Sequence, residues 1–456
     1  MSAMKIDQKK WISKTGDYTV YRMMVPVVLE LIFTFIISNI NQLIINQFSK
    51  DAVAATTAAG SFLSLMVNLY SIFYVGQGIL LAPCWGRREY SEAGRIWTVS
   101  LCDNLLLSIL LAGIGIFGGP FVLKWMQVPM ELEKMAGEYL AIALGLSAFQ
   151  GAALTFASAF RSIGDMKTVM LGNTLINGSC VIMNYLVLIL IPAEEQRLYQ
   201  YVLAGIISQI FGCVFYIARA LRNGQIEFRI FVPEWRAQFG KISARIARFG
   251  VFGGLEGVIY LVSQTIIVAM LGKLGTEALL VKGYTANLTN YLTIPASAIS
   301  VVAATVIGMS IGMLDEERAQ GCLRKCLKLG LAATVLLCGA ALLFGRRFLG
   351  LYITESELTD ACMLILVIDL AVEVFRCVAA LMVSALKAIG DVKATFYMVI
   401  AGSVLNVGIS WLLGIGLGLG LPGIWAGYGV DLAFRGLLGI WIWRRHVKLH
   451  SYPVRR

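Results

Sequence analysis

The chain has 456 residues, of which 58% are hydrophobic and 14% are charged. A soluble globular protein averages about 25% charged residues and at most about half apolar residues, so this composition excludes a soluble protein and indicates one that crosses a membrane many times. The formal net charge of +11 is typical of basic cytoplasmic loops beside anionic lipids, and we expect no nucleic-acid partner.

Hydropathy predicts twelve membrane-spanning helices, six in each half of the chain. The expected spans are residues 20–46, 54–80, 95–118, 134–159, 168–191, 198–221, 246–271, 278–306, 325–345, 360–385, 394–415 and 422–444. Lys and Arg gather in both tails and in alternate loops, whereas the remaining loops carry mainly Glu and Asp, so both termini are expected in the cytoplasm. The sequence therefore predicts an all-α, multi-pass protein embedded in the bilayer of the cell (inner or plasma) membrane.

The first span, within Met23–Phe48, carries polar side chains along one face. Pro26 lies near its start, and Glu30, Thr34 and Asn41 follow at spacings that return to nearly the same side of a helix. An ionised carboxylate inside a bilayer is costly unless it faces a partner or water. We interpret this stripe as part of a transport site; the alternative is a polar seam that joins helices.

The second half of the chain repeats the first at a constant offset. Glu256 stands where Glu30 stood, an offset of 256 − 30 = 226, and residues 158–165 (SAFRSIGD) align at the same offset with residues 384–391 (SALKAIGD). An even number of spans per half gives both repeats the same orientation, so we expect a parallel repeat about an axis along the membrane normal. Asp165 and Asp391 are expected to be structural, each accepting backbone N–H bonds at the start of the next helix. The expected organisation is a cytoplasmic tail (1–19), a first lobe (20–222), a cytoplasmic linker (223–244), a second lobe (245–445) and a C-terminal tail (446–456).

The acids inside the spans are the candidate sites for a coupling cation. Burial disfavours their charged form, so such a carboxyl can take up and release a proton or a cation near physiological pH. Asp369, Glu373 and Arg376 follow at spacings of four and three on one helix face, which indicates either a polar cavity or a self-contained ion network. The residues expected to bind the coupling cation are Glu30, Glu256, Asp369 and Glu373, and those expected to line a substrate cavity are Thr34, Asn41, Gln150, Asn177, Asn184, Tyr260 and Arg376.

Several motifs together point to a family. They are the Pro26 helix leading into residues 48–55 (FSKDAVAA), Ala82-Pro83 with Gly86, the two Ile-Gly-Asp segments of the repeat, and residues 274–278 (LGTEA). With the six-plus-six repeat, they make residues 20 to 445 resemble the multidrug and toxic compound extrusion (MATE) transporters. The resemblance implies two lobes in a V around a central cavity, and export of organic, often cationic, compounds driven by entry of Na⁺ or H⁺.

The chain departs from the family at the positions that the resemblance associates with coupling. Where the family has an Asp in the first span this chain has Asn41, and it has Asn184 and Cys180 where the family has an Asp and an Asn. In another branch of the family, acids lie at the positions of Tyr260 and Arg376. We therefore expect Glu30 to be the main coupling residue, and the proton to be the coupling ion, because a Na⁺ site needs several oxygen ligands.

Three functions are consistent with the sequence. The first is a secondary transporter that exports small amphipathic, cationic organic compounds by antiport with H⁺ or Na⁺ in alternating access. The second is a flippase for a lipid-linked glycan or peptide precursor, which the basic residues Arg376 and Lys282 favour. The third is a scaffold or receptor that transports nothing, although the chain shows no extramembrane segment longer than its short linker.

Other classes of function lack their motifs. The nine cysteines have no metal-ligand spacing, and no phosphate-binding loop or nucleophilic triad is visible. We expect no enzymatic activity, no metal site and no cofactor apart from the coupling ion. The expected partners are a small organic substrate and the lipid bilayer, with the chain acting as a monomer.

Overall fold

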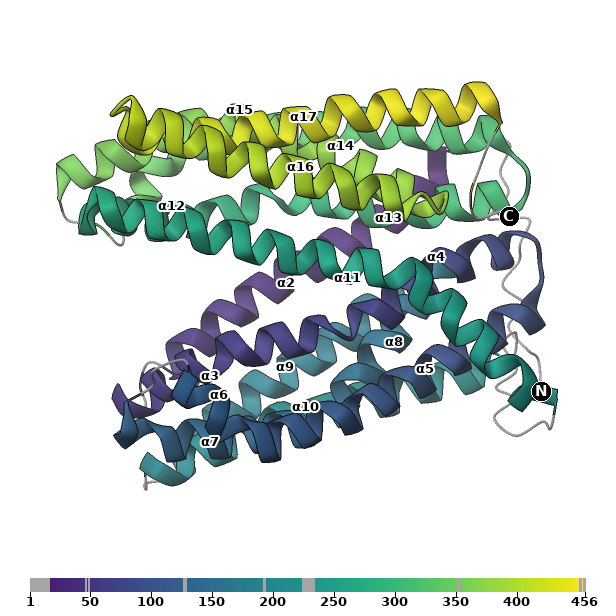
Figure 1. Cartoon of the computed structure of the whole chain (residues 1–456), viewed down its shortest axis with the longest axis horizontal. Coiled ribbons are helices and arrows are strands. Elements are labelled where there is room, and N and C mark those ends of the chain that lie inside the picture. The colour runs from purple at the N-terminus through teal and green to yellow at the C-terminus, as the bar shows by residue number, and fades with distance from the viewer. Residues whose placement is uncertain are drawn as a thin grey trace. The chain divides into compact units, whose positions relative to one another are not determined.

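The computed structural model describes residues 17–45, 47, 50–125, 129–191, 194–223, 234–350, 353, 355–450 and 453. Within these ranges the backbone forms helices joined by short connections, and no β-strand is present. The all-helical fold expected from hydropathy is therefore confirmed (Figure 1). Most of the predicted N-terminal tail, residues 224–233 of the linker and most of residues 451–456 lie outside the described residues.

The helices follow the order of the predicted spans. Those of the first half are α2 (Asp17–Ile45), α3 (Lys50–Asn68), α4 (Ser71–Gly86), α5 (Tyr90–Gly113), α6 (Gly119–Trp125), α7 (Met130–Gly145), α8 (Ala148–Ser162), α9 (Met166–Leu190) and α10 (Glu194–Asn223). Those of the second half are α11 (Glu234–Leu274), α12 (Thr276–Leu292), α13 (Ile294–Gly312), α14 (Glu316–Leu349), α15 (Ser356–Ala388), α16 (Val392–Ser410) and α17 (Gly420–Leu449). Two π-helical segments, η1 (Ile114–Gly118) and η2 (Trp411–Gly416), extend α5 and α16.

Among the described residues, nine helical segments are long and apolar enough to cross a membrane, or ten if Leu132–Gly145 and Ala148–Ser162 form one bent span. The two predicted spans beyond these ten correspond to α15 and α17. Each of these helices carries charged residues in its middle, Asp369, Glu373 and Arg376 in α15 and Asp431 with Arg435 in α17. The count of twelve therefore stays a prediction.

Three of the predicted spans are divided into two helices. Residues 54–80 include the break between α3 and α4, residues 134–159 that between α7 and α8, and residues 278–306 that between α12 and α13. The last break has a visible cause in the sequence. Pro295 lies in the first turn of α13, where its missing N–H cannot continue a helix from α12.

The described residues form two compact units. Unit 1 consists of residues 29–254, and unit 2 of residues 17–28 together with residues 255 onward. α2 and α11 therefore each contribute to both units, α2 changing after Val28 and α11 after Gly254. The sequence placed the boundary in the linker at residues 223–244, whereas in the structure the first part of α11 still belongs to unit 1.

Close packing between α4 and α11 explains this assignment. A Cβ atom on Gly76 would clash with the carbonyl oxygen of Ile246, and one on Gly250 with that of Ile72. Glycine at both positions lets the two backbones touch, as is typical of helices packed in membranes. The hydroxyl of Ser243 in α11 also donates to Asp103 of α5 at 3.0 Å.

Each unit has its own core. In unit 1, α4 packs against α5 and α8, and α9 packs against α10. Trp97, Phe156, Phe160 and Tyr216 form an aromatic cluster there, with ring centroids 5.5–6.2 Å apart. In unit 2, α17 packs against α15 and α16, and α13 packs against α14 and α15 (Figure 1).

The backbone bears the repeat that the sequence predicts. Gly164 and Gly390 are 226 residues apart, and they have φ angles of 84° and 87°. Arg88 and Leu314 are also separated by 226 residues, and both have left-handed φ angles, 64° and 61°, that side-chain-bearing residues seldom adopt. The same local conformation therefore recurs at the same register in each half.

Candidate functional site

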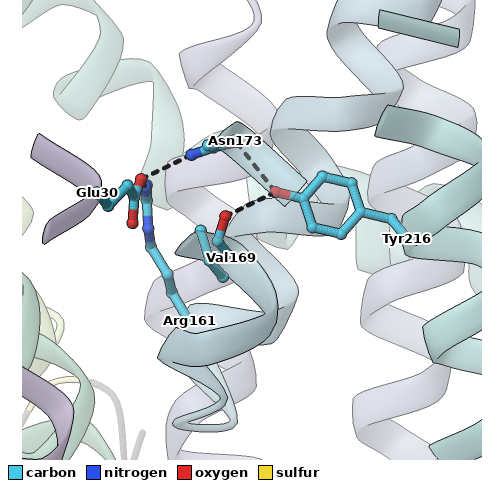
Figure 2. A network of polar contacts seen from close by, with 5 residues as sticks. All are labelled: Glu30, Arg161, Val169, Asn173 and Tyr216. Atoms are coloured by element: carbon cyan, nitrogen blue, oxygen red, sulfur yellow. Dashed lines mark hydrogen bonds and ion pairs between the residues drawn. The ribbon is translucent and has the colours of Figure 1, made fainter. Parts of the chain in front are cut away.

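Glu30 lies in a network of polar contacts within unit 1. Its Oε1 pairs with the guanidinium of Arg161 from α8, and it also accepts a hydrogen bond from the Asn173 amide of α9 at 2.6 Å (Figure 2). The Tyr216 hydroxyl of α10 donates to the Asn173 side-chain oxygen at 3.0 Å and lies 3.3 Å from the carbonyl oxygen of Val169. Four helices thus meet around one buried carboxylate.

Neighbouring residues fix the position of Tyr216. Its ring stacks on Phe156 and Phe160 of α8. Gly172 of α9 makes room for it, because a Cβ atom at that position would clash with the tyrosine ring. Tyr216 therefore holds Asn173 so that the Asn173 amide points at Glu30, as Figure 2 shows.

Glu256 occupies the equivalent place in unit 2. It pairs with the ammonium of Lys387 from α15 and accepts a hydrogen bond from the Thr395 hydroxyl of α16 at 2.8 Å. Lys387 is the repeat counterpart of Arg161, since 387 − 161 = 226. Both halves therefore join the first helix to the end of the fourth predicted span by an acid–base pair.

The positions at which the family has acids hold neutral groups in unit 1. The Asn184 amide donates to the Asn41 side-chain oxygen at 3.0 Å, and it lies 3.4 Å from the Cys180 sulfur. Asn184 is fully buried, and its own side-chain oxygen has no hydrogen-bond partner in the described part of the chain. The structure thus brings together three residues that the sequence had singled out, and none of them is a carboxylic acid.

The third cluster lies in α15 of unit 2. Glu373 and Arg376 form an ion pair at 2.7 Å, and the Thr289 hydroxyl of α12 donates to Asp369 at 2.6 Å. Asp369 is 2% exposed and Glu373 0%. The other three candidate coupling acids each form an ion pair, whereas Asp369 forms none with the described residues.

The remaining predicted cavity residues divide between the units. Thr34, Gln150 and Asn177 belong to unit 1 and are half-buried, whereas Tyr260 belongs to unit 2 and is 46% exposed. Sequence reasoning did not assign Tyr216 or Thr289 to a site, and it did not foresee the pairing of the two glutamates with basic residues. The repeat held a signal for that pairing, because acid and base both recur at the offset of 226.

Asp165 and Asp391 each cap a helix, as the sequence predicted. Asp165 accepts a hydrogen bond from the Thr168 backbone N–H at 3.1 Å, and Asp391 from that of Ala394 at 3.3 Å, so both cap the helix that follows. In the part of the chain that the structure describes, no group of three or more His, Cys, Asp or Glu side chains could hold a metal ion.

Long apolar helices with buried, paired charges are typical of a protein that crosses the membrane many times. The MatE family model matches residues 26–186 and again residues 254–412, and the chain therefore belongs to the MatE family of membrane transporters. The two matches fall in the two halves, as the internal repeat predicts.

Known proteins resemble the chain along nearly its whole length. It is 24% identical to the uncharacterized transporter YisQ of Bacillus subtilis (strain 168) over 96% of both chains. It is 21% identical to the probable multidrug resistance protein YoeA of the same organism, over 93% of this chain and 94% of the relative. An outward-facing structure of a multidrug resistance MATE family transporter of the MOP superfamily has the same fold, with a TM-score of 0.88 at 16% identity over 98% of this chain and 99% of that one.

Proposed function

We propose that this protein exports small amphipathic, cationic organic compounds in exchange for protons, and that Asp369 carries the coupling proton. The relative named as a probable multidrug resistance protein supports this class of substrate. The chain would act as a monomer, with the substrate and the proton taking alternate access to the two sides of the membrane.

The observation that carries the proposal is the environment of Asp369. This carboxyl is buried, accepts a hydrogen bond from the hydroxyl of Thr289, and forms no ion pair with the described residues. Burial of a carboxylate is costly, and Arg376, the basic residue on the same helix face, already forms an ion pair with Glu373. A proton or a cationic substrate can supply the missing positive charge, and competition between the two gives antiport.

The other candidate acids have different environments. Glu30 is paired with Arg161 and Glu256 with Lys387, so protonation of either glutamate would break its ion pair. Glu373 lies one turn after Asp369 on α15 and forms an ion pair with Arg376. We therefore place the proton at Asp369 rather than at Glu30, which the sequence favoured.

The variant Asp369→Asn tests this assignment, because asparagine keeps the size and the hydrogen-bond acceptor but cannot exchange a proton. In proteoliposomes with an imposed pH gradient, we expect ethidium efflux to fall by about tenfold or more. The matched control is Asp360→Asn on the same helix, where the acid is 61% exposed and pairs with Arg346. Wild-type efflux by Asp369→Asn, or efflux that requires Na⁺ at constant pH, would contradict the proposal.

One observation favours a second candidate, a flippase for a lipid-linked precursor. The Arg376 side chain is 25% exposed, and a guanidinium suits a phosphate group better than it suits a cation. Translocation of a fluorescent lipid pyrophosphate in the same proteoliposomes, lost in Arg376→Gln, would support this function over drug export.

A further inference from the structure

The paired glutamates lie at a particular place in the chain. α2 enters unit 1 at Leu29, and Glu30 is the next residue; α11 enters unit 2 at Leu255, and Glu256 is the next residue. Among the described helices, only these two contribute residues to both units. Each ion pair therefore lies immediately after the point at which a shared helix joins its new unit.

Both pairs bind the shared helix to the unit that it enters. Glu30 and Arg161 belong to unit 1, and Glu256 and Lys387 to unit 2. The side chains of the two glutamates are 5% and 9% exposed. A carboxylate so deeply buried is stable only with its counter-ion, so sliding or rotation of the helix at this point would separate the charges at a large cost.

Residues that disfavour an α-helix lie just before each of these ion pairs. Pro26 lies four residues before Glu30 inside α2, where it removes one backbone hydrogen bond. Gly253 and Gly254 precede Glu256 in α11, and glycine is a poor helix former. An ion pair that fixes the helix directly after such residues restricts bending of the helix to one place during a conformational change.

The polar contacts around Glu30 and those around Glu256 have the ion pair in common, but the other hydrogen-bond partners differ. The counterpart of Asn173 at the offset of 226 is Val399, and that of Tyr216 is Ile442, so neither of these hydrogen-bond partners is repeated. Thr395 likewise corresponds to Val169. The acid–base pair has thus persisted in both copies of a diverged duplication, which indicates a role common to both halves.

We propose that Arg161 and Lys387 are positioning residues of the transport cycle, which hold α2 and α11 through Glu30 and Glu256 at the point where each helix enters its second unit. This inference rests on the proposed transport function, because it concerns the change of conformation by which transport occurs. Loss of either anchor should slow that change without altering how tightly substrate binds.

The test compares the variants Arg161→Gln and Lys387→Gln with the conservative variants Arg161→Lys and Lys387→Arg. Each conservative variant introduces the basic residue type that the other half has at the equivalent position. In proteoliposomes we expect the glutamine variants to lower the maximal rate of ethidium efflux per folded molecule by about tenfold, while the half-saturating ethidium concentration changes by less than about twofold. The conservative variants should stay within about threefold of the wild type.

A second measurement follows the units directly and does not depend on the identity of the substrate. Nitroxide labels are attached to p-acetylphenylalanine at Leu221 in unit 1 and at Leu449 in unit 2, which are 71% and 61% exposed, so the native cysteines remain in place. We expect Arg161→Gln and Lys387→Gln to broaden or shift the distribution of distances between the labels. Arg435→Gln is the matched control, since the partners of Arg435, Asp431 in α17 and Ser403 in α16, both lie in unit 2 and neither lies on a shared helix.

The outcomes separate the possible roles. If the glutamine variants lower only thermal stability and leave the maximal rate and the distance distribution as in the wild type, the pairs merely brace the fold and the inference is wrong. Should Arg161→Gln fail to fold, Glu30→Asp keeps the charge, shortens the side chain and carries the same expectation. A wild-type protein that exports no ethidium would contradict the proposed function, whereas the distance measurement would still decide the role of the anchors.

Discussion

At the scale of single residues, the partner of a buried carboxylate decides what it can do. Glu30 and Asp369 are both acids within predicted spans, and both are at least nine-tenths buried. Arg161 forms an ion pair with the first, whereas the hydroxyl of Thr289 donates a hydrogen bond to the second. A fixed ion pair suits a structural joint, and an acid without an ion pair of its own suits proton exchange.

The helix caps give a prediction at this scale. Asp165 accepts hydrogen bonds from both the backbone N–H and the hydroxyl of Thr168, at 3.1 and 2.6 Å. Asp165→Ala should lower the free energy of unfolding by about 1–2 kcal/mol, seen as a lower apparent Tm in detergent. Asp165→Asn keeps the cap acceptor and should stay close to the wild type. Loss of pH-driven efflux by the well-folded alanine variant would contradict a purely structural role.

The sequence could locate these acids but not their partners. The constant offset identified Glu30 with Glu256, and it aligned Arg161 with Lys387, without showing that each acid meets its base. Glu30 and Arg161 are 131 residues apart, so their contact depends on how α2 packs on α8. Thr289 is also distant from Asp369 in the sequence, by 80 residues, and nothing in its neighbourhood marks it as a hydrogen-bond partner.

At the scale of helices, glycine sets how closely α4 and α11 can approach. Gly250→Ala places a methyl group against the Ile72 carbonyl, a backbone atom that cannot move aside. We expect a loss of about 3 kcal/mol or more, measured as a fall in apparent Tm. Gly240→Ala is the matched control on the same helix, because no atom lies within 4 Å of its Cβ position. That variant should gain about 0.5–1 kcal/mol from helix propensity, and equal effects of the two changes would argue against close packing.

Hydropathy predicted the order of the helices well and their interruptions poorly. The hydropathy averaged over a predicted span depends only on its apolar content. Because α3 and α4 are both apolar, this average does not reveal the break between them at Leu69 and Tyr70. Pro295 was a local signal for the break before α13, but residues 69–70 contain neither glycine nor proline. Tertiary packing sets that break, since Tyr70 is buried and bonds to Ser147 at 2.8 Å.

At the scale of the whole molecule, the distribution of charge predicts the orientation in the membrane. Basic residues dominate both tails, and Glu194 and Glu195 follow α9 at the start of α10. Green fluorescent protein fused after Arg456 should fluoresce, because it folds in the cytoplasm, and alkaline phosphatase fused after Ile191 should be active, because it folds outside. The reverse pattern would overturn the predicted topology and leave the helical fold untouched.

The replacement of acids by amides around Cys180 has a consequence for the energetics of transport. If Asp369 carries the proton and unit 1 carries none, each cycle exchanges one proton for one substrate. For a monovalent cation the exchange is electroneutral, so the membrane potential adds nothing to the driving force. The pH difference alone then sets the attainable gradient, at about 1.4 kcal/mol per pH unit, or a tenfold ratio of substrate concentrations. Cells whose proton motive force is mostly electrical would obtain little export from this protein, and acidification of the medium would increase it.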